Sequence, residues 1–222
     1  MRYLVVGQGI TAKSVVAHCE RQAVPCAQID TLDALASVDR AQFDCLVISP
    51  GLDRRHTAIQ ALLEAGVPVI GDIELFMQSF TGKIIAVTGS NGKSTTVSMV
   101  DHVLRASGYH SALGGNIGLA ALDLLIDPPE IAVLELSSFQ LESTPSMHSS
   151  VATVLNVTED HLDRYSGMDD YAQTKRHIYR QSDHVISNAD DALTQTGGLM
   201  RAVPVARILE RKSIWLGADR WS

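Results

Sequence analysis

Short apolar runs alternate with longer amphipathic stretches along most of this chain. The short runs are rich in Val, Ile and Leu, which is typical of strands buried in a parallel sheet. We expect such strands at 3–7, 26–29, 45–49, 67–70, 131–136, 151–157 and 184–187, and one more beginning at Ile84. Apolar residues at helical spacing predict helices at 12–22, 57–65, 94–106 and 171–180. This alternation of strand and helix predicts an α/β protein with open parallel sheets.

The pattern divides the chain near Gly82 and Lys83, where a second series of strands and helices begins. We therefore expect a first domain at 1–82 and a second at 83–222. In the second domain, the apolar face of the first helix is expected to consist of Val97, Val100, Val103 and Leu104.

Composition and charge narrow the classes of function. The 222 residues are 45% hydrophobic, enough for ordinary cores, and the net charge is -7, with acidic residues in excess in both halves. A nucleic-acid partner is therefore not expected. The sequence has no apolar run of membrane-spanning length and no secretory leader pattern, so we expect a cytoplasmic protein without membrane insertion. Cys19, Cys26 and Cys45 have no paired spacing, which favours reduced thiols over a disulfide framework or a zinc site.

The clearest chemical signal is TGSNGKST at Thr88–Thr95, where an apolar strand leads into a glycine turn, a lysine and two hydroxyls. Glycines let the backbone turn its N–H groups toward an anion, and the following helix adds its positive dipole end. The common P-loop pattern has a glycine where this chain has Val87, so the loop is not the standard form. A solvated strand-to-helix turn would explain the glycines but not the Lys-Ser-Thr sequence. The expected nucleotide-binding residues are Gly89, Ser90, Asn91, Gly92, Lys93, Ser94 and Thr95.

Two further glycine turns are weaker signals. Gly7 and Gly9 follow the first strand as in a dinucleotide-binding turn, but Ala12 replaces the third glycine. Helix–strand packing and nucleotide contact both remain open there, with Asp30 at the end of the second strand as a candidate ribose ligand. The turn around Asn116 could hold a polar substrate or could simply be a tight entry into a helix.

Acidic and imidazole side chains follow the central strands of the second domain. Glu135 ends a buried strand, where an unpaired carboxylate is costly, so we expect it to share a Mg²⁺ ion with Ser94 or to act as a hydrogen-bonded cap. The polar cluster at 156–163 follows the next strand and includes His161, a candidate metal ligand. For Lys175, spacing alone predicts only a solvated lysine.

Together, four segments resemble the Mur ligases: TGSNGKST at 88–95, GGNIG at 114–118, ELSSFQLE at 135–142 and NVTEDHLDRY at 156–165. GQGIT at 7–11, SPG at 49–51 and GDIELF at 71–76 narrow the resemblance to the Mur ligases that add D-glutamate. The resemblance implies a Rossmann-like open-sheet domain at 1–82 that binds a UDP substrate. It also implies an incomplete P-loop ATPase-type parallel-sheet domain at 83–222.

The activity implied by the resemblance is ATP-dependent ligation of D-glutamate to UDP-N-acetylmuramoyl-L-alanine through an acyl phosphate, in bacterial peptidoglycan synthesis. Lys93 would hold the β- and γ-phosphates, and Lys93, His161 and Lys175 would be catalytic. Two Mg²⁺ sites would involve Ser94, Glu135, His161 and a Lys175 carbamylated by CO₂. The enzyme is expected to be a monomer.

The resemblance also implies the residues that contact the UDP substrate. Ile10, Thr11, Asp30 and Thr31 would hold the uracil end, and Ser49 and Gly51 would lie near the diphosphate. The muramoyl-alanine portion would contact Asn116, Ser137 and Gln140.

Family members have three domains, whereas this chain stops at Ser222 inside the expected central domain. From this we expect that the chain alone is not catalytically competent and lacks the D-glutamate-binding domain. Three alternatives remain at this point: a sister ligase that adds another amino acid, a non-catalytic module that binds the UDP-muramoyl substrate, and a P-loop NTPase switch.

Overall fold

The computed structural model describes residues 1–161, 163–188, 190–196 and 205–207. Its first sheet contains four parallel strands. The strand order is β2-β1-β3-β4. The strands are β1 (Tyr3–Val6), β2 (Cys26–Ile29), β3 (Cys45–Ile48) and β4 (Val69–Ile70). Their helices are α1 (Ile10–Arg21), α2 (Thr57–Glu64) and α3 (Asp72–Ser79), with 3₁₀ helices η1 (Asp33–Ser37) and η2 (Arg40–Gln42).

The second sheet also has only parallel pairings, in the order β10-β9-β8-β5-β7-β6. Its strands are β5 (Lys83–Thr88), β6 (Ser111–Gly115), β7 (Ile131–Glu135), β8 (Ser149–Val154), β9 (Ser182–Ser187) and β10 (Val205–Arg207). Its helices are α4 (Lys93–Ala106), α5 (Ser138–Glu142) and α6 (Met168–Arg176), with 3₁₀ helices η3 (Ala121–Leu125), η4 (His177–Tyr179) and η5 (Ala192–Thr194). The prediction of an α/β protein with open parallel sheets is confirmed.

Helices cover both faces of the second sheet, as apolar strands of a parallel sheet require. Val97 of α4 is buried against Val87 and Val133 on one face. On the other face, Tyr171 of α6 and Ile178 of η4 belong to the main core. The predicted apolar face of α4 was partly wrong, because the side chain of Val103 is 57% exposed while Val97, Val100 and Leu104 pack as expected.

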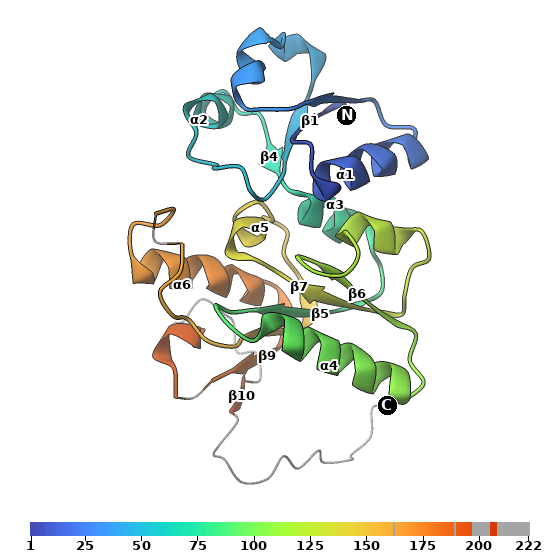
Figure 1. Ribbon diagram of the computed structural model, residues 1–222, viewed down its shortest axis with the longest axis vertical. Coiled ribbons are helices and arrows are strands. Elements are labelled where there is room, and N and C mark those ends of the chain that lie inside the picture. Colours follow the sequence, from blue (N-terminus) through green and yellow to red (C-terminus); the bar gives the residue numbers. More distant parts are fainter. Residues whose placement is uncertain (162, 189, 197–204, 208–222) are drawn as a thin grey trace.

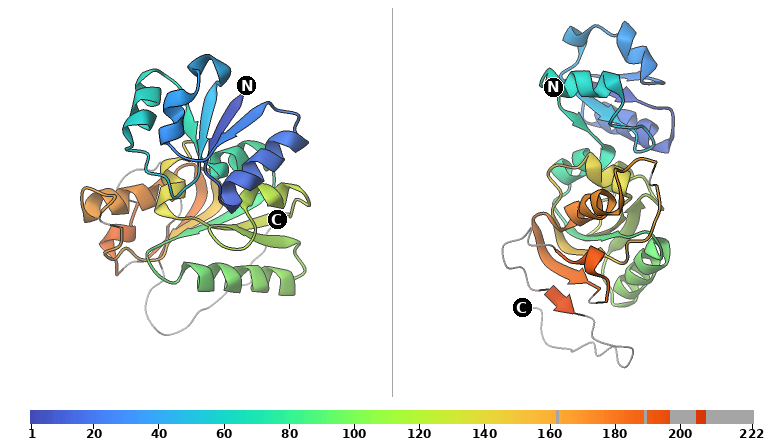
Figure 2. Two further views of the ribbon diagram at one scale, coloured as in Figure 1. Left: turned by 45° about the horizontal axis from the view of Figure 1, so that its top comes forward. Right: turned by 90° about the vertical axis from the view of Figure 1, so that its left-hand side faces the viewer.

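Helix α3 joins the two sheets, which lie one above the other along the long axis of the molecule (Figure 1; Figure 2). Phe76 of α3 is fully buried and belongs to one apolar core that extends from Val5 in the first sheet to Val185 in the second. Glu74 of α3 accepts hydrogen bonds from the backbone N–H and the hydroxyl of Ser146, at 3.0 and 2.8 Å. The connection between the sheets is therefore packed and hydrogen-bonded.

The strand order of the second sheet determines where its loops meet. β5 lies between β7 and β8, and Val87 pairs with Glu135 while Thr88 pairs with Val154. Because all three strands are parallel, the loops that follow them emerge at one edge of the sheet, where ligands bind in open α/β folds. In the part of the chain that the structure describes, no helix is both long enough and apolar enough to cross a membrane.

Candidate nucleotide and metal site

The two glycines of the loop between β5 and α4 adopt backbone conformations that favour glycine. Gly89 has a φ of 154° and Gly92 a φ of 81°, conformations that L side chains rarely adopt. The backbone N–H of Ser90 donates to the carbonyl of Asn156, and that of Asn91 donates to the Asn156 side chain. Two N–H groups of the loop are thus bound by the segment after β8. The start of α4, whose first N–H groups lack helical partners, is the part of the loop suited to an anion.

Two lysines converge on this loop. Lys93 Nζ donates to the carbonyl oxygens of Gly89 and Ser90 at 2.9 and 3.0 Å, and Lys175 Nζ donates to the same Gly89 oxygen at 3.0 Å. The Lys175 nitrogen also lies 4.4 Å from the centre of the Tyr171 ring. These contacts bring the lysine of the loop and the lysine of α6 to one point at the sheet edge.

Lys175 is not the solvated lysine that its spacing predicts, because only 2% of the residue is exposed. Burial, together with the charge of Lys93, lowers its pKa to about 7, and the charge of Asp160 partly opposes this shift. An amine with this pKa is unprotonated in a large fraction of molecules at neutral pH. Spacing could not show this, because the burial depends on how α6 packs against the loop.

Glu135 and Ser94 are joined by a hydrogen bond. The Ser94 hydroxyl donates to Glu135 Oε2 at 2.8 Å, and the Asn116 amide donates to Oε1 at 2.8 Å. Asn116 reaches this position because Gly115 passes close to the strand, where a Cβ would come within 2.4 Å of the Glu135 carbonyl oxygen. Helix α5 begins at Ser138, so Glu135 is not a helix-capping carboxylate.

The surroundings of Glu135 fit a bound cation. The residue is 1% exposed, and no positively charged side chain among the described residues forms an ion pair with it. A buried carboxylate with only neutral donors is costly, and Mg²⁺ prefers oxygen ligands such as those of Glu135 and Ser94. Together with the free start of α4 and Lys93, this donor set suits a magnesium–phosphate group.

His161 lies on a different part of the same edge. Its Nε2 is 3.4 Å from Asp160 Oδ2, and its ring centre is 4.9 Å from that of Phe139. Within the described residues, no hydrogen bond or ion pair joins His161 to Glu135 or Ser94, and no three His, Cys, Asp or Glu side chains form a metal-binding group. The structure therefore places Ser94 and Glu135 together, Lys93 and Lys175 together, and His161 beside Asp160.

In the first sheet, the residues expected to bind the UDP substrate follow β1, β2 and β3. Those of the proposed uracil end are on the surface: the side chain of Ile10 is 78% exposed, and Asp30 and Thr31 are also exposed. Thr11 is half-buried at the start of α1. Ser49 and Gly51 follow β3, and the Ser49 hydroxyl donates to the Val6 carbonyl at 3.1 Å, so it is available to a ligand only as an acceptor.

The residues expected at the muramoyl-alanine portion form a helix cap. Ser137 caps α5 by accepting from the Gln140 backbone N–H at 3.2 Å, while Gln140 Oε1 accepts from the Ser137 backbone N–H at 3.0 Å. The amide nitrogen of Gln140 is the part of that side chain left for a ligand. Sequence reasoning gave these two residues a ligand role and missed the cap.

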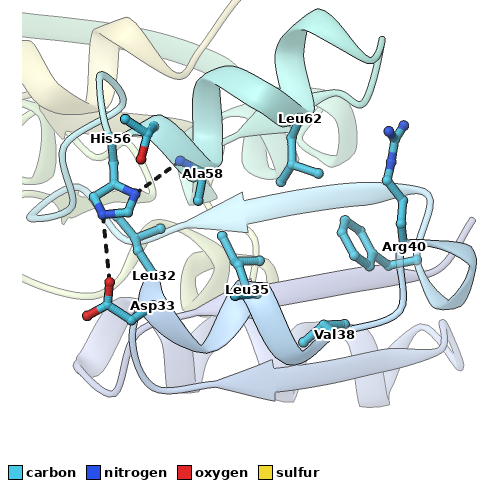
Figure 3. Close-up of a pocket in the computed structure, with 11 residues that line it drawn as sticks. Leu32, Asp33, Leu35, Val38, Arg40, His56, Ala58 and Leu62 are labelled. Carbon is cyan, nitrogen blue, oxygen red and sulfur yellow. Dashed lines mark hydrogen bonds and ion pairs between the residues drawn. The ribbon is translucent and has the colours of Figure 1, made fainter.

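A separate cavity of about 390 Å³ lies between η1 and α2 (Figure 3). Beside it, His56 Nε2 lies 3.9 Å from Asp33 Oδ1. Its walls are largely apolar and include Leu32, Leu35 and Leu62. None of the expected site residues lines it.

Comparison with known proteins identifies the family of this chain. The family model described as "Mur ligase middle domain" matches residues 87–208. The chain belongs to the Mur ligase family. This Mur ligase chain is 47% identical over 177 residues to the UDP-N-acetylmuramoylalanine–D-glutamate ligase of Pasteurella multocida (strain Pm70), covering 80% of the chain and 40% of that protein. The ligase with the same name from Haemophilus influenzae (strain PittEE) is 41% identical, over 98% of the chain and 52% of its own length.

This Mur ligase chain thus spans about half the length of the curated relatives it matches. Among solved structures, it is similar to a pseudomurein peptide ligase type C from Methanothermus fervidus, with a TM-score of 0.50 and 18% identity, over 93% of the chain and 48% of that protein. At this identity the likeness shows the fold alone.

The site of this Mur ligase chain also includes residues that sequence reasoning did not assign. Tyr171 lies against Lys175, and its hydroxyl is 3.4 Å from that of Ser90. Phe139 packs on His161, and the guanidinium of Arg164 lies 3.9 Å from the centre of the Phe139 ring. Phe139 and Arg164 belong to motifs that carried the family resemblance, which was the available signal. Tyr171 and Lys175 are four residues apart on a predicted helix, a spacing that puts them on one face, but the sequence did not show that this face packs against the loop.

Proposed function

We propose that this chain is part of an ATP-dependent ligase that joins D-glutamate to UDP-N-acetylmuramoyl-L-alanine through an acyl phosphate. The observation that carries the proposal is the meeting of Lys93, Lys175 and the Ser94–Glu135 pair around one loop at the sheet edge. Membership of the Mur ligase family and the D-glutamate ligases among the relatives support the choice of substrates.

We propose the following roles for the chain's own residues. Lys93 turns from its loop carbonyls toward the β- and γ-phosphates of ATP, and the start of α4 holds these phosphates with its N–H groups. Ser94 and Glu135 hold one Mg²⁺, and His161 takes part in a second site. Mg²⁺ at these positions would neutralise charge on the transferred phosphoryl group. Asn116 stays bound to Glu135 and presents its carbonyl oxygen toward the sugar substrate.

The proposed division of labour follows the two sheets. Residues 1–82 bind the UDP substrate through Ile10, Thr11, Asp30, Thr31, Ser49 and Gly51, and residues 83–222 belong to the ATP-binding domain. Exposure of Ile10, Asp30 and Thr31 at the carboxyl ends of β1 and β2 supports the first assignment. Ser137 and Gln140 join Asn116 in contacting the muramoyl-alanine portion.

We further propose that Lys175 is carbamylated. The ammonium would first lose a proton; the neutral amine would then form an N–C bond to CO₂ and release a second proton, leaving an anionic carbamate able to support the metal site. Burial of Lys175 next to Lys93 supports this, because it favours the neutral amine that the reaction needs.

Carbamylation of Lys175 should depend on pH in a way set by its lowered pKa of about 7. At fixed dissolved CO₂, uptake should be high above pH 7 and fall as the amine is protonated below it, whereas an ordinary lysine would need a pH near 10. Carbon-13 NMR of the protein in labelled bicarbonate measures the carbamate directly. Lys93→Met should shift the onset to higher pH, because removing the neighbouring charge raises the Lys175 pKa. A carbamate signal that persists in Lys175→Met would show that the assignment is wrong.

The ligase proposal is tested by phosphate release from ATP in the full natural protein, with UDP-N-acetylmuramoyl-L-alanine and D-glutamate added separately and together. Release that requires both substrates supports it. Release with a different amino acid would identify a sister ligase, and tight binding of the UDP substrate without any ATP hydrolysis would identify a binding module.

A further inference from the structure

Arginines connect the loop after β3 to the loop after β8. Arg164 Nη2 donates to the carbonyl of Leu52 at 3.1 Å, and in the opposite direction Arg55 Nη2 donates to the carbonyl of Asp163 at 3.3 Å. The first loop carries Ser49 and the second carries His161. These two hydrogen bonds therefore join the two loops in both directions.

The guanidinium of Arg164 is held by charge as well as by hydrogen bonds. Its side chain is 11% exposed, with Nη2 3.5 Å from Glu142 Oε2 and Nε 3.9 Å from Asp53 Oδ1. Hydrogen bonds from Arg55, together with the charge of Arg164, lower the pKa of Asp53 to about 2. Asp53 therefore stays ionised. A largely buried guanidinium with partners on the loop after β3 and on α5 has little freedom to turn.

Arg164 is connected to His161 in two ways. Its guanidinium lies 3.9 Å from the centre of the Phe139 ring, and that ring lies 4.9 Å from the ring of His161. The backbone N–H of Arg164 also donates to the His161 carbonyl at 2.9 Å. His161 has a φ of 52°, a left-handed conformation that a non-glycine residue keeps only where its surroundings hold it.

From these contacts we infer that Arg164 is a positioning residue: through Phe139 and the turn it closes, it fixes the imidazole of His161 and anchors it to the loop that carries Ser49. The metal-binding consequence rests on the proposed function, in which His161 serves a Mg²⁺ site. The inference that Arg164 fixes the imidazole of His161 depends only on contacts within this chain. The competing view is that Arg164 holds the two sheets together and leaves His161 unaffected.

The contact between the rings of His161 and Phe139 tests directly whether Arg164 fixes the imidazole. Proton NMR of the protein labelled at His and Phe should show a nuclear Overhauser effect between His161 and Phe139 in the natural sequence. Arg164→Met, which removes the planar charge and keeps much of the side-chain length, should abolish this contact, and Arg164→Lys should weaken it. Arg105→Met is the matched control, because Arg105 has an exposed side chain that forms an ion pair with Asp101 on α4. An unchanged effect in a folded Arg164→Met or Arg164→Lys protein would overturn the proposal.

A second measurement uses the full natural protein. Arg164→Lys should raise the Mg²⁺ concentration needed for half-maximal activity roughly tenfold, the size typical of residues that orient metal ligands, with the KM for D-glutamate unchanged. Equal changes in both constants would indicate general damage and contradict a role through His161. If the full protein shows no ligase activity, the proposed function fails, and the NMR contact still decides the role of Arg164.

Discussion

Replacing Lys93 with Met in the full natural protein should lower ATP-dependent product formation by about 10³-fold or more. The ammonium group lies at the loop that would hold the transferred phosphoryl group, and cations positioned there contribute most where negative charge develops. Initial rates at saturating ATP and substrates measure the loss. Stability should fall by about 2 kcal/mol, because Lys93 donates two hydrogen bonds, both to carbonyls of its own loop, and the net contribution of such a bond is about 1 kcal/mol.

Lys83→Met is the matched control for this substitution, since Lys83 is an exposed lysine at the opposite end of the same strand. It should keep near-natural activity. The Lys93 variant also alters the charge next to Lys175, so the carbamate signal must be recorded in the same protein. A Lys93→Met enzyme that retains a tenth or more of its activity would contradict the assignment of Lys93 to the phosphates.

Glu135→Gln should lower activity without lowering the stability of the metal-free protein. Activity should fall roughly 10²- to 10³-fold and require more Mg²⁺, because the amide cannot supply the anionic ligand. The metal-free protein should be at least as stable as the natural one, and more stable by roughly 1 kcal/mol where the buried carboxylate has no cation. Urea unfolding with a chelator measures the second effect.

Glu130→Gln provides the control for Glu135, because Glu130 is an exposed glutamate just before the same strand. It should leave both activity and stability close to natural values. If Glu135→Gln destabilises the metal-free protein, the role of Glu135 is to accept hydrogen bonds from Ser94 and Asn116 and not to bind a metal.

The sheet architecture could be predicted because strand periodicity and burial go together in parallel sheets. The strand predicted at 131–136 is observed at Ile131–Glu135, and the one predicted at 26–29 is observed unchanged. The segment between β2 and β3 received no prediction, yet it contains η1 and η2. Short 3₁₀ helices have too few residues to produce a periodic pattern, so their apolar residues do not stand out.

The backbone of the glycine loop could be anticipated because one continuous segment contains its glycines. Residues 88–95 hold the glycines, the lysine and the serine in sequence, and the observed loop has the backbone they require. The environment of Lys175 was not predictable, because its burial depends on α6 packing against the loop that carries Gly89, 86 residues earlier in the chain. The same holds for Arg164, whose partners Leu52 and Asp53 are remote in sequence.

The apolar core that passes from β1 through α3 into the second sheet limits how this polypeptide can be dissected. Severing the backbone between α3 and β5 would leave Phe76 and its neighbours without their partners on one fragment, and bare the matching surface around Leu122 on the other. Each separately expressed half would therefore expose apolar surface that is buried in the intact chain. Reconstitution would require the two fragments to associate faster than either one aggregates.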